Sequence, residues 1–168
     1  MTTPAWALSL IYWLHMLATV VWIGGLSTLA ILVLPAASQA LDARSYAGLL
    51  GKIRRRLDSM SWLSLLVLVG TGLFQMSANP NYQGFLSVSN RWALAILLKH
   101  ILFLAMTGLS AYLTWGVLPH LQRLALRLSA GQDAPESQRL WQREARLVRL
   151  NLLLGVLILA LTAIARAA

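Results

Sequence analysis

The stretch at residues 6–34 reads WALSLIYWLHMLATVVWIGGLSTLAILVL and contains no charged residue. It exceeds the ~20 consecutive apolar residues that a helix needs to cross a bilayer. Comparable apolar runs occupy residues 59–77, 92–118 and 147–165, and none of them alternates polar with apolar residues as a barrel strand would. The sequence therefore predicts a single all-α domain, residues 1–168, in which four transmembrane helices form a polytopic membrane bundle.

The composition and the positions of the charges agree with a membrane environment. Apolar residues make up 58% of the chain and charged residues 11%, which is too little charge to cover a soluble domain. The net charge of +9 would suit a nucleic-acid-binding protein, but all basic residues except Arg91, Lys99 and Arg166 lie in or directly beside the first and third connections between the runs. The positive-inside bias puts those connections in the cytoplasm. We therefore expect no nucleic-acid partner, and a bacterial-type inner membrane protein with both termini on the periplasmic side.

Several classes of chemistry are excluded by what the chain lacks. It has no cysteine, which excludes disulfides, iron–sulfur clusters and thiolate metal sites. It has no glycine-rich phosphate loop, no pair of carboxylates within a run and no metalloprotease motif, so hydrolysis and phosphoryl transfer are not expected. The first run is too long for a cleavable signal peptide and no Lys or Arg precedes it, so we expect it to remain as a helix.

A faint internal repeat relates the first apolar run to the third. The similar segments are residues 14–17 with 99–102, 25–27 with 108–110, and 33–35 with 117–119. Each of the two runs is followed by a basic connection and a leucine-rich run. This pattern indicates a duplicated two-helix unit, repeated in parallel about an axis along the membrane normal.

Two of the three histidines, His15 and His100, lie inside predicted spans, where an ionisable side chain costs about 3 kcal/mol and usually has a function. His15 follows Trp6 by nine residues and His100 follows Trp92 by eight, so at ~1.5 Å per residue both lie ~12–14 Å below the outer tryptophans. Two imidazoles at one depth on equivalent helices favour a cofactor ligated from both sides, and haem b is the simplest fit. A hydrogen bond between helices is the alternative role for both histidines.

Neighbouring residues suit a flat, acidic cofactor. Gly25 and Gly72, on the first and second helices, leave room for a ring, although close helix packing is an equally good reason for such glycines. Lys99 and Arg91 lie in the outer half, where no carboxylate could neutralise them. The propionates of a porphyrin would supply those anions, and Lys99 could instead be a ligand itself.

Three short segments stand out in the first run: WLHML at residues 13–17, VVWIGGL at 20–26 and VLP at 33–35. Together with Thr71-Gly72 on the second run and Leu98-Lys99-His100 on the third, they resemble the CopD-type (copper resistance D) four-helix membrane domain. Because of this resemblance we add Trp22 to the residues expected to contact the cofactor.

The resemblance implies two different functions. CopD-type proteins are associated with copper handling at the inner membrane, whereas the related HemJ proteins are haem-binding oxidases of protoporphyrinogen. The HemJ resemblance implies that His15 and Lys99 ligate the haem. The chain lacks the Tyr-Leu-Pro-Arg stretch that HemJ carries soon after its first-helix histidine.

The leading hypothesis is a membrane haem b protein with an electron-transfer or oxidoreductase role, in which His15 and either His100 or Lys99 ligate the iron. The internal repeat favours His100 as the second ligand. The first alternative is a copper import or copper-binding protein that uses the two histidines with Met16, Met76 and Met106. The second is a cofactor-free accessory subunit. Besides the lipid bilayer, we expect a redox partner or a larger membrane complex, with a homo-oligomer as an alternative.

The topology is tested with a reporter that is active only outside the cytoplasm. Fused after Ala168 the reporter should be active, and inserted within residues 131–137 it should be inactive, because the basic third connection stays in the cytoplasm. The opposite activities would invert the bundle and place His15 and His100 towards the cytoplasm.

Overall fold

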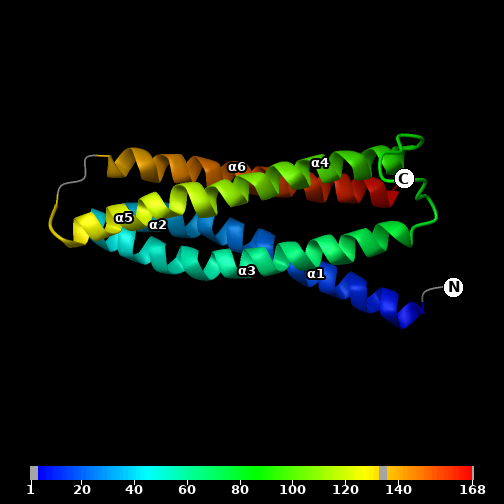
Figure 1. The fold of residues 1–168 in the computed structure, drawn as a ribbon, viewed down its shortest axis with the longest axis horizontal. Coiled ribbons are helices and arrows are strands. Elements are labelled where there is room, and N and C mark those ends of the chain that lie inside the picture. The colour runs from blue at the N-terminus through cyan, green and yellow to red at the C-terminus, as the bar shows by residue number, and fades with distance from the viewer. Residues whose placement is uncertain (1–3, 133–135, 168) are drawn as a thin grey trace.

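Four long helices run side by side along the molecule (Figure 1). The computed structural model describes residues 4–132 and 136–167. In these residues each of the four helices is long and apolar enough to cross a membrane, which confirms the predicted all-α membrane bundle. The elements are α1 (Ala5–Ser27), η1 (Thr28–Val33), α2 (Leu34–Ala40), α3 (Ala43–Ser77), α4 (Arg91–Ala111), η2 (Tyr112–Val117), α5 (Leu118–Ser129) and α6 (Ser137–Ala167).

The helices extend well beyond the apolar runs at one end of the molecule. This end, which we call the basic end, holds the α2–α3 and α5–α6 connections, whereas both chain termini lie at the opposite, terminal end (Figure 1). The basic stretches predicted as loops are therefore largely helical. The reason is amphipathic spacing: on α5, Leu121 and Leu124 are buried while Arg123 and Arg127 are not, so one face packs on the bundle and the other meets water.

Two short π-helices, η1 and η2, interrupt the first and third helices at matching places. Each lies directly before a Leu-Pro pair, Leu34-Pro35 or Leu118-Pro119. A proline has no N–H to donate and its ring clashes with the carbonyl four residues earlier, so a regular α-helix cannot continue through it. The backbone widens instead, and the N–H groups of Leu34 and Leu118 donate to the carbonyls of Leu29 and Leu113, five residues back. The match supports the predicted duplication.

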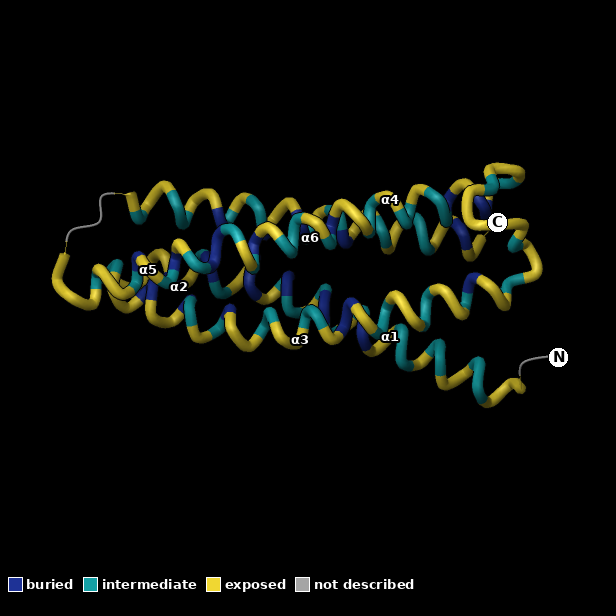
Figure 2. The backbone as a smooth tube through the Cα atoms, in the orientation of Figure 1, coloured by how far each residue is buried: buried dark blue, intermediate teal, exposed yellow. Residues whose placement is uncertain are grey.

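The helices are packed as two pairs, α1 along α3 and α4 along α6, with further contacts of α5 with α3 and of α1 and η1 with α6. The main core fills the middle and the basic half of the bundle, where Leu29, Leu113 and Val148 are almost completely buried. Towards its N-terminus, α1 diverges from the α4–α6 pair (Figures 1 and 2). A second, smaller core at the terminal end packs Met76 of α3 with Trp92 of α4 and Ala165 of α6, so the two pairs are joined at both ends.

Side-chain caps begin α3 and α4. Asp42 accepts a hydrogen bond from the Ser45 N–H at 3.3 Å, and Asn90 accepts one from the Ala93 N–H at 2.7 Å. The Ser45 side chain, and after it the nearby backbone N–H groups, hold the pKa of the Asp42 carboxyl below its ordinary value, so the carboxylate stays charged at neutral pH. Asp42 thus starts α3 only two residues after α2 ends at Ala40.

Truncating the core at η1 should weaken the bundle. Leu29 is 1% exposed and Leu32, in the same π-helix, is 63% exposed. Leu29→Ala should therefore lower the free energy of unfolding in detergent by about 2 kcal/mol or more, because it leaves a cavity, whereas Leu32→Ala removes only lipid-facing surface. Equal losses for the two variants, measured by denaturant titration, would contradict the position of this core.

Candidate functional site

His15 lies on α1 with its ring directed at α3. Its Nδ1 is 2.8 Å from Oγ1 of Thr71, and the same Thr71 oxygen is 2.6 Å from the carbonyl oxygen of Val67. A carbonyl can only accept, so the single hydroxyl hydrogen of Thr71 is donated to Val67. Thr71 must then accept from His15, which places the ring proton on Nδ1 and leaves the lone pair of Nε2 free.

This contact is the hydrogen bond between helices that was the alternative role for His15, and it is also compatible with a histidine metal ligand. Metal-binding imidazoles usually donate one ring N–H to a fixed acceptor, which orients the ring and its other nitrogen. Thr71 supplies that acceptor from a neighbouring helix, and His15 is only half-buried. Nε2 of His15 is therefore an oriented nitrogen donor within a predicted membrane span.

Gly72 allows the ring to lie against α3. A Cβ atom at this position would be 3.4 Å from Cε1 of His15, so any larger side chain would compete with the imidazole for space. Gly25 has a different environment, since a Cβ atom there would meet the Leu57 side chain of α3 at 3.4 Å. Of the two glycines expected near a cofactor, Gly72 thus contacts His15, and Gly25 serves close helix packing.

Two further cations lie in the terminal half. Lys99 is half-buried on α4, and Arg166 lies near the end of α6. The Arg166 guanidinium lies over the Tyr12 ring, 5.3 Å from its centroid. Arg91 is exposed at the start of α4. The terminal half therefore carries several cations, and the sequence supplies no acid there to balance them.

His100 has other neighbours. Its Nδ1 lies 2.7 Å from the carbonyl oxygen of Ile96, so it also carries the ring proton on Nδ1, and its ring packs edge-on against Phe85 with centroids 4.9 Å apart. Phe85 belongs to the connection between α3 and α4. No contact between His100 and His15 is found in residues 4–132 and 136–167, so the two imidazoles are not brought together by a direct contact.

The π-helices give an independent register for the repeat. Counted back from the proline that follows each π-helix, His15 lies 20 residues before Pro35, and Lys99 lies 20 residues before Pro119. The position equivalent to His15 is therefore Lys99, and His100 lies one residue further along α4. One residue on a helix turns the side chain by ~100°, which is enough to move it to another face.

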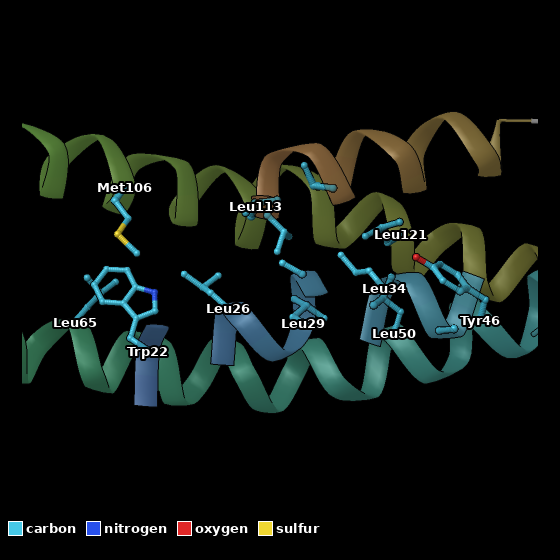
Figure 3. Close-up of a cluster of buried hydrophobic side chains, with 14 residues drawn as sticks. Trp22, Leu26, Leu29, Leu34, Tyr46, Leu50, Leu65, Met106, Leu113 and Leu121 are labelled. Atoms are coloured by element: carbon cyan, nitrogen blue, oxygen red, sulfur yellow. The ribbon is translucent and has the colours of Figure 1, made fainter. Parts of the chain in front are cut away.

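Trp22 closes the region on its inner side. It is 3% exposed and meets Phe103 of α4 edge-on, with ring centroids 5.9 Å apart. Figure 3 shows Trp22 beside Leu65 of α3 and Met106 of α4, in the core cluster that joins the helix pairs. Because Trp22 follows His15 by seven residues, this apolar floor lies ~10 Å inward of the imidazole.

The donor set limits how a metal could be held. Within the part of the chain that the structure describes, no three His, Asp or Glu side chains are grouped to hold a metal ion. The methionines are also scattered: Met16 is 66% exposed, Met76 packs near Trp92, and Met106 lies in the main core. A metal at His15 would therefore need most of its ligands from elsewhere, as a porphyrin provides.

Sequence reasoning missed the role of Thr71, which was noted only for the resemblance. A threonine in a membrane helix usually bonds its own backbone, as Thr71 does, so nothing in the sequence alone indicates that the same oxygen also receives His15. It also missed Phe85, because aromatic residues in a connection carry no signal of a distant partner. The sequence singles out His15 because it lies inside an apolar run, but its hydrogen-bond partner Thr71 is seen only in the structure.

Comparison with known proteins identifies one family. The family described as Copper resistance protein D matches residues 51–165, which includes Thr71, Gly72, Lys99 and His100 but not α1. No curated protein and no solved structure matches the chain.

The contact between Gly72 and His15 can be tested directly. Gly72→Leu should displace the ring from Thr71, so the ¹⁵N NMR signals of the His15 Nδ1–H tautomer in histidine-labelled protein should shift or disappear. Gly70→Leu is the matched control, because nothing lies within 4 Å of a Cβ there. An unchanged His15 signal in Gly72→Leu would show that the ring does not lie on α3.

Proposed function

The chain belongs to the copper resistance protein D family, and within that family we propose that it is a membrane haem b protein whose iron is ligated by His15. The observation that carries the proposal is the state of His15: Nδ1–H is donated to Thr71, and Nε2 is left as an oriented donor. The haem would supply one-electron chemistry when bound. The protein would contribute the ligand, the orientation of the ring and an apolar floor at Trp22.

The charges of the terminal half support an acidic cofactor. Lys99 and Arg91 have no carboxylate partner in that half of the chain, and two anionic propionates would neutralise them. An uncompensated ammonium in a membrane span is costly, and Lys99 avoids that cost either by pairing with an anion or by giving up its proton to become a ligand. A porphyrin would supply both the remaining ligands of a metal at His15 and the anions that face the cations of the terminal half.

The arrangement of the helices also agrees with a cofactor between the pairs. α1 packs along α3, and α4 packs along α6, while the N-terminal part of α1 diverges from the α4–α6 pair (Figure 1). His15 lies on that diverging part, whereas Trp22 lies where α1 and α4 meet. A flat ring could therefore separate α1 from α4 without opening the core.

Two candidates exist for the second ligand, and the positions favour Lys99. It is equivalent to His15 in the register of the two π-helices, whereas His100 packs against Phe85. A lysine must give up its proton before it can ligate iron, which is a cost that His100 does not carry.

An electron-transfer or oxidoreductase role would also require a redox partner, a larger complex or a second copy of the chain in the membrane.

Replacing His15 is the decisive test. His15→Ala removes a ligand under either pairing, so the haem content after haem-replete expression should fall at least about tenfold, as read from the Soret band of the purified protein. His120→Ala is the matched control, because His120 is exposed at the basic end and bonds its own backbone at Gly116. Wild-type protein without a Soret band, or His15→Ala with an unchanged spectrum, would contradict the proposal.

Copper binding is the second candidate, and the family description favours it. His15 and His100 offer nitrogen donors that suit copper, but Met16, Met76 and Met106 are not gathered beside them. Metal analysis of the same purified protein separates the candidates: stoichiometric copper without haem would establish the copper role. Protein that holds neither group would instead support an accessory subunit.

A further inference from the structure

A buried cluster of charges joins α3 to α6 at the basic end. Nε of Arg54 is 3.0 Å from Oε1 of Glu144, and Nη1 of Arg54 is 3.9 Å from Oδ1 of Asp58. Glu144 is 0% exposed, Arg54 is 4% exposed and Asp58 is 16% exposed. Because α3 and α6 belong to different helix pairs, the cluster lies at the seam between the pairs.

The cluster is not electrically balanced. One guanidinium faces two carboxyl groups, so the fully ionised cluster of Arg54, Asp58 and Glu144 carries a net charge of −1. Among the described residues, the hydroxyls of Tyr46 on α3 and Thr114 on η2 also face it, and they carry no charge at neutral pH. An uncompensated charge in a buried, water-poor setting is costly, and one added proton would remove it.

The hydrogen bonding is also incomplete. Although Nε of Arg54 is near Glu144, the two atoms are not aligned for a hydrogen bond, and buried polar atoms of Arg54, Asp58 and Glu144 have no partner. The indole N–H of Trp141, one turn from Glu144 on α6, has none either. Buried polar atoms are nearly always paired with protein or with water. The site therefore has unused donors and acceptors for a proton and for ordered water.

We propose that this cluster is a proton-binding site, in which the Glu144 carboxylate takes one proton from the water at the basic end of the bundle. An O–H bond of hydronium breaks, an O–H bond forms on Glu144, and a water molecule is released. Asp58 is the most exposed member and would be the entry point, whereas Arg54 lies beside both carboxyls. The proposal does not depend on the metal site at His15.

Further buried polar side chains lie deeper in the bundle than the cluster. Two turns from Glu144 along α6, the amide of Asn151 donates to the hydroxyl of Ser110 on α4 at 2.8 Å. One turn beyond Ser110, the hydroxyl of Thr107 is buried without a partner. These groups lie at the α4–α6 interface, towards the middle of the span.

Infrared difference spectroscopy of the full chain in lipid tests the proposal. Between about pH 9 and about pH 6, where ordinary carboxyls stay ionised, the wild type should gain the C=O band of a protonated carboxyl. The band should shift in deuterated buffer and should be absent from Glu144→Gln. It should remain in Glu136→Gln, the matched control, because Glu136 is exposed at the same end of the molecule.

Asp58→Asn provides a second readout. It leaves the Arg54–Glu144 pair neutral without a proton, so the midpoint of the band should move to lower pH by about one unit or more. No band in the wild type would overturn the proposal, whether or not Glu144→Gln folds. A band that survives in Glu144→Gln would overturn the assignment to Glu144.

Discussion

In a bilayer, each backbone N–H and C=O must find its partner inside the protein, and this constraint accounts for most of the fold. It permits long helices and penalises any break in them, even at Pro35 and Pro119. The chain meets the constraint by widening each helix into a π segment, in which Leu34 and Leu118 bond five residues back instead of four. Because the two π segments are equivalent, residues at the same distance before them, such as His15 and Lys99, occupy equivalent positions on the two helices.

The same constraint applies to side chains. Among the polar contacts between helices within or beside the spans are His15 with Thr71, Asn151 with Ser110, and Arg54 with Glu144. The first pair belongs to α1 and α3, and the other two connect α4 and α3 to α6. Each contact therefore has a structural role. Chemistry is to be sought at atoms such as the oxygens of Glu144, which have no hydrogen-bond partner, and Nε2 of His15, which the bond at Nδ1 leaves free.

The sequence predicts the number of spans, the all-α class and the depth of His15, since hydropathy and helical rise determine them. It does not predict that α3 begins at Ala43, because hydropathy detects the lipid-facing part of a helix and not its amphipathic extension. Arg54 looks like its neighbours Arg55 and Arg56, which are exposed. Its burial could have been suspected from spacing, because Arg54 continues the four-residue spacing of Tyr46 and Leu50, both buried. Its partner Glu144 could not have been suspected, because a single sequence carries no information on which helices pack together.

The central claim is that His15 presents Nε2 to a metal centre in the terminal half of the bundle. Electron–nuclear double resonance on the oxidised protein, labelled with ¹⁵N only in histidine, measures this most directly. The account predicts a strongly coupled imidazole nitrogen that is present in the His120→Ala protein and lost in His15→Ala. A paramagnetic centre without strong coupling to any histidine nitrogen would contradict it.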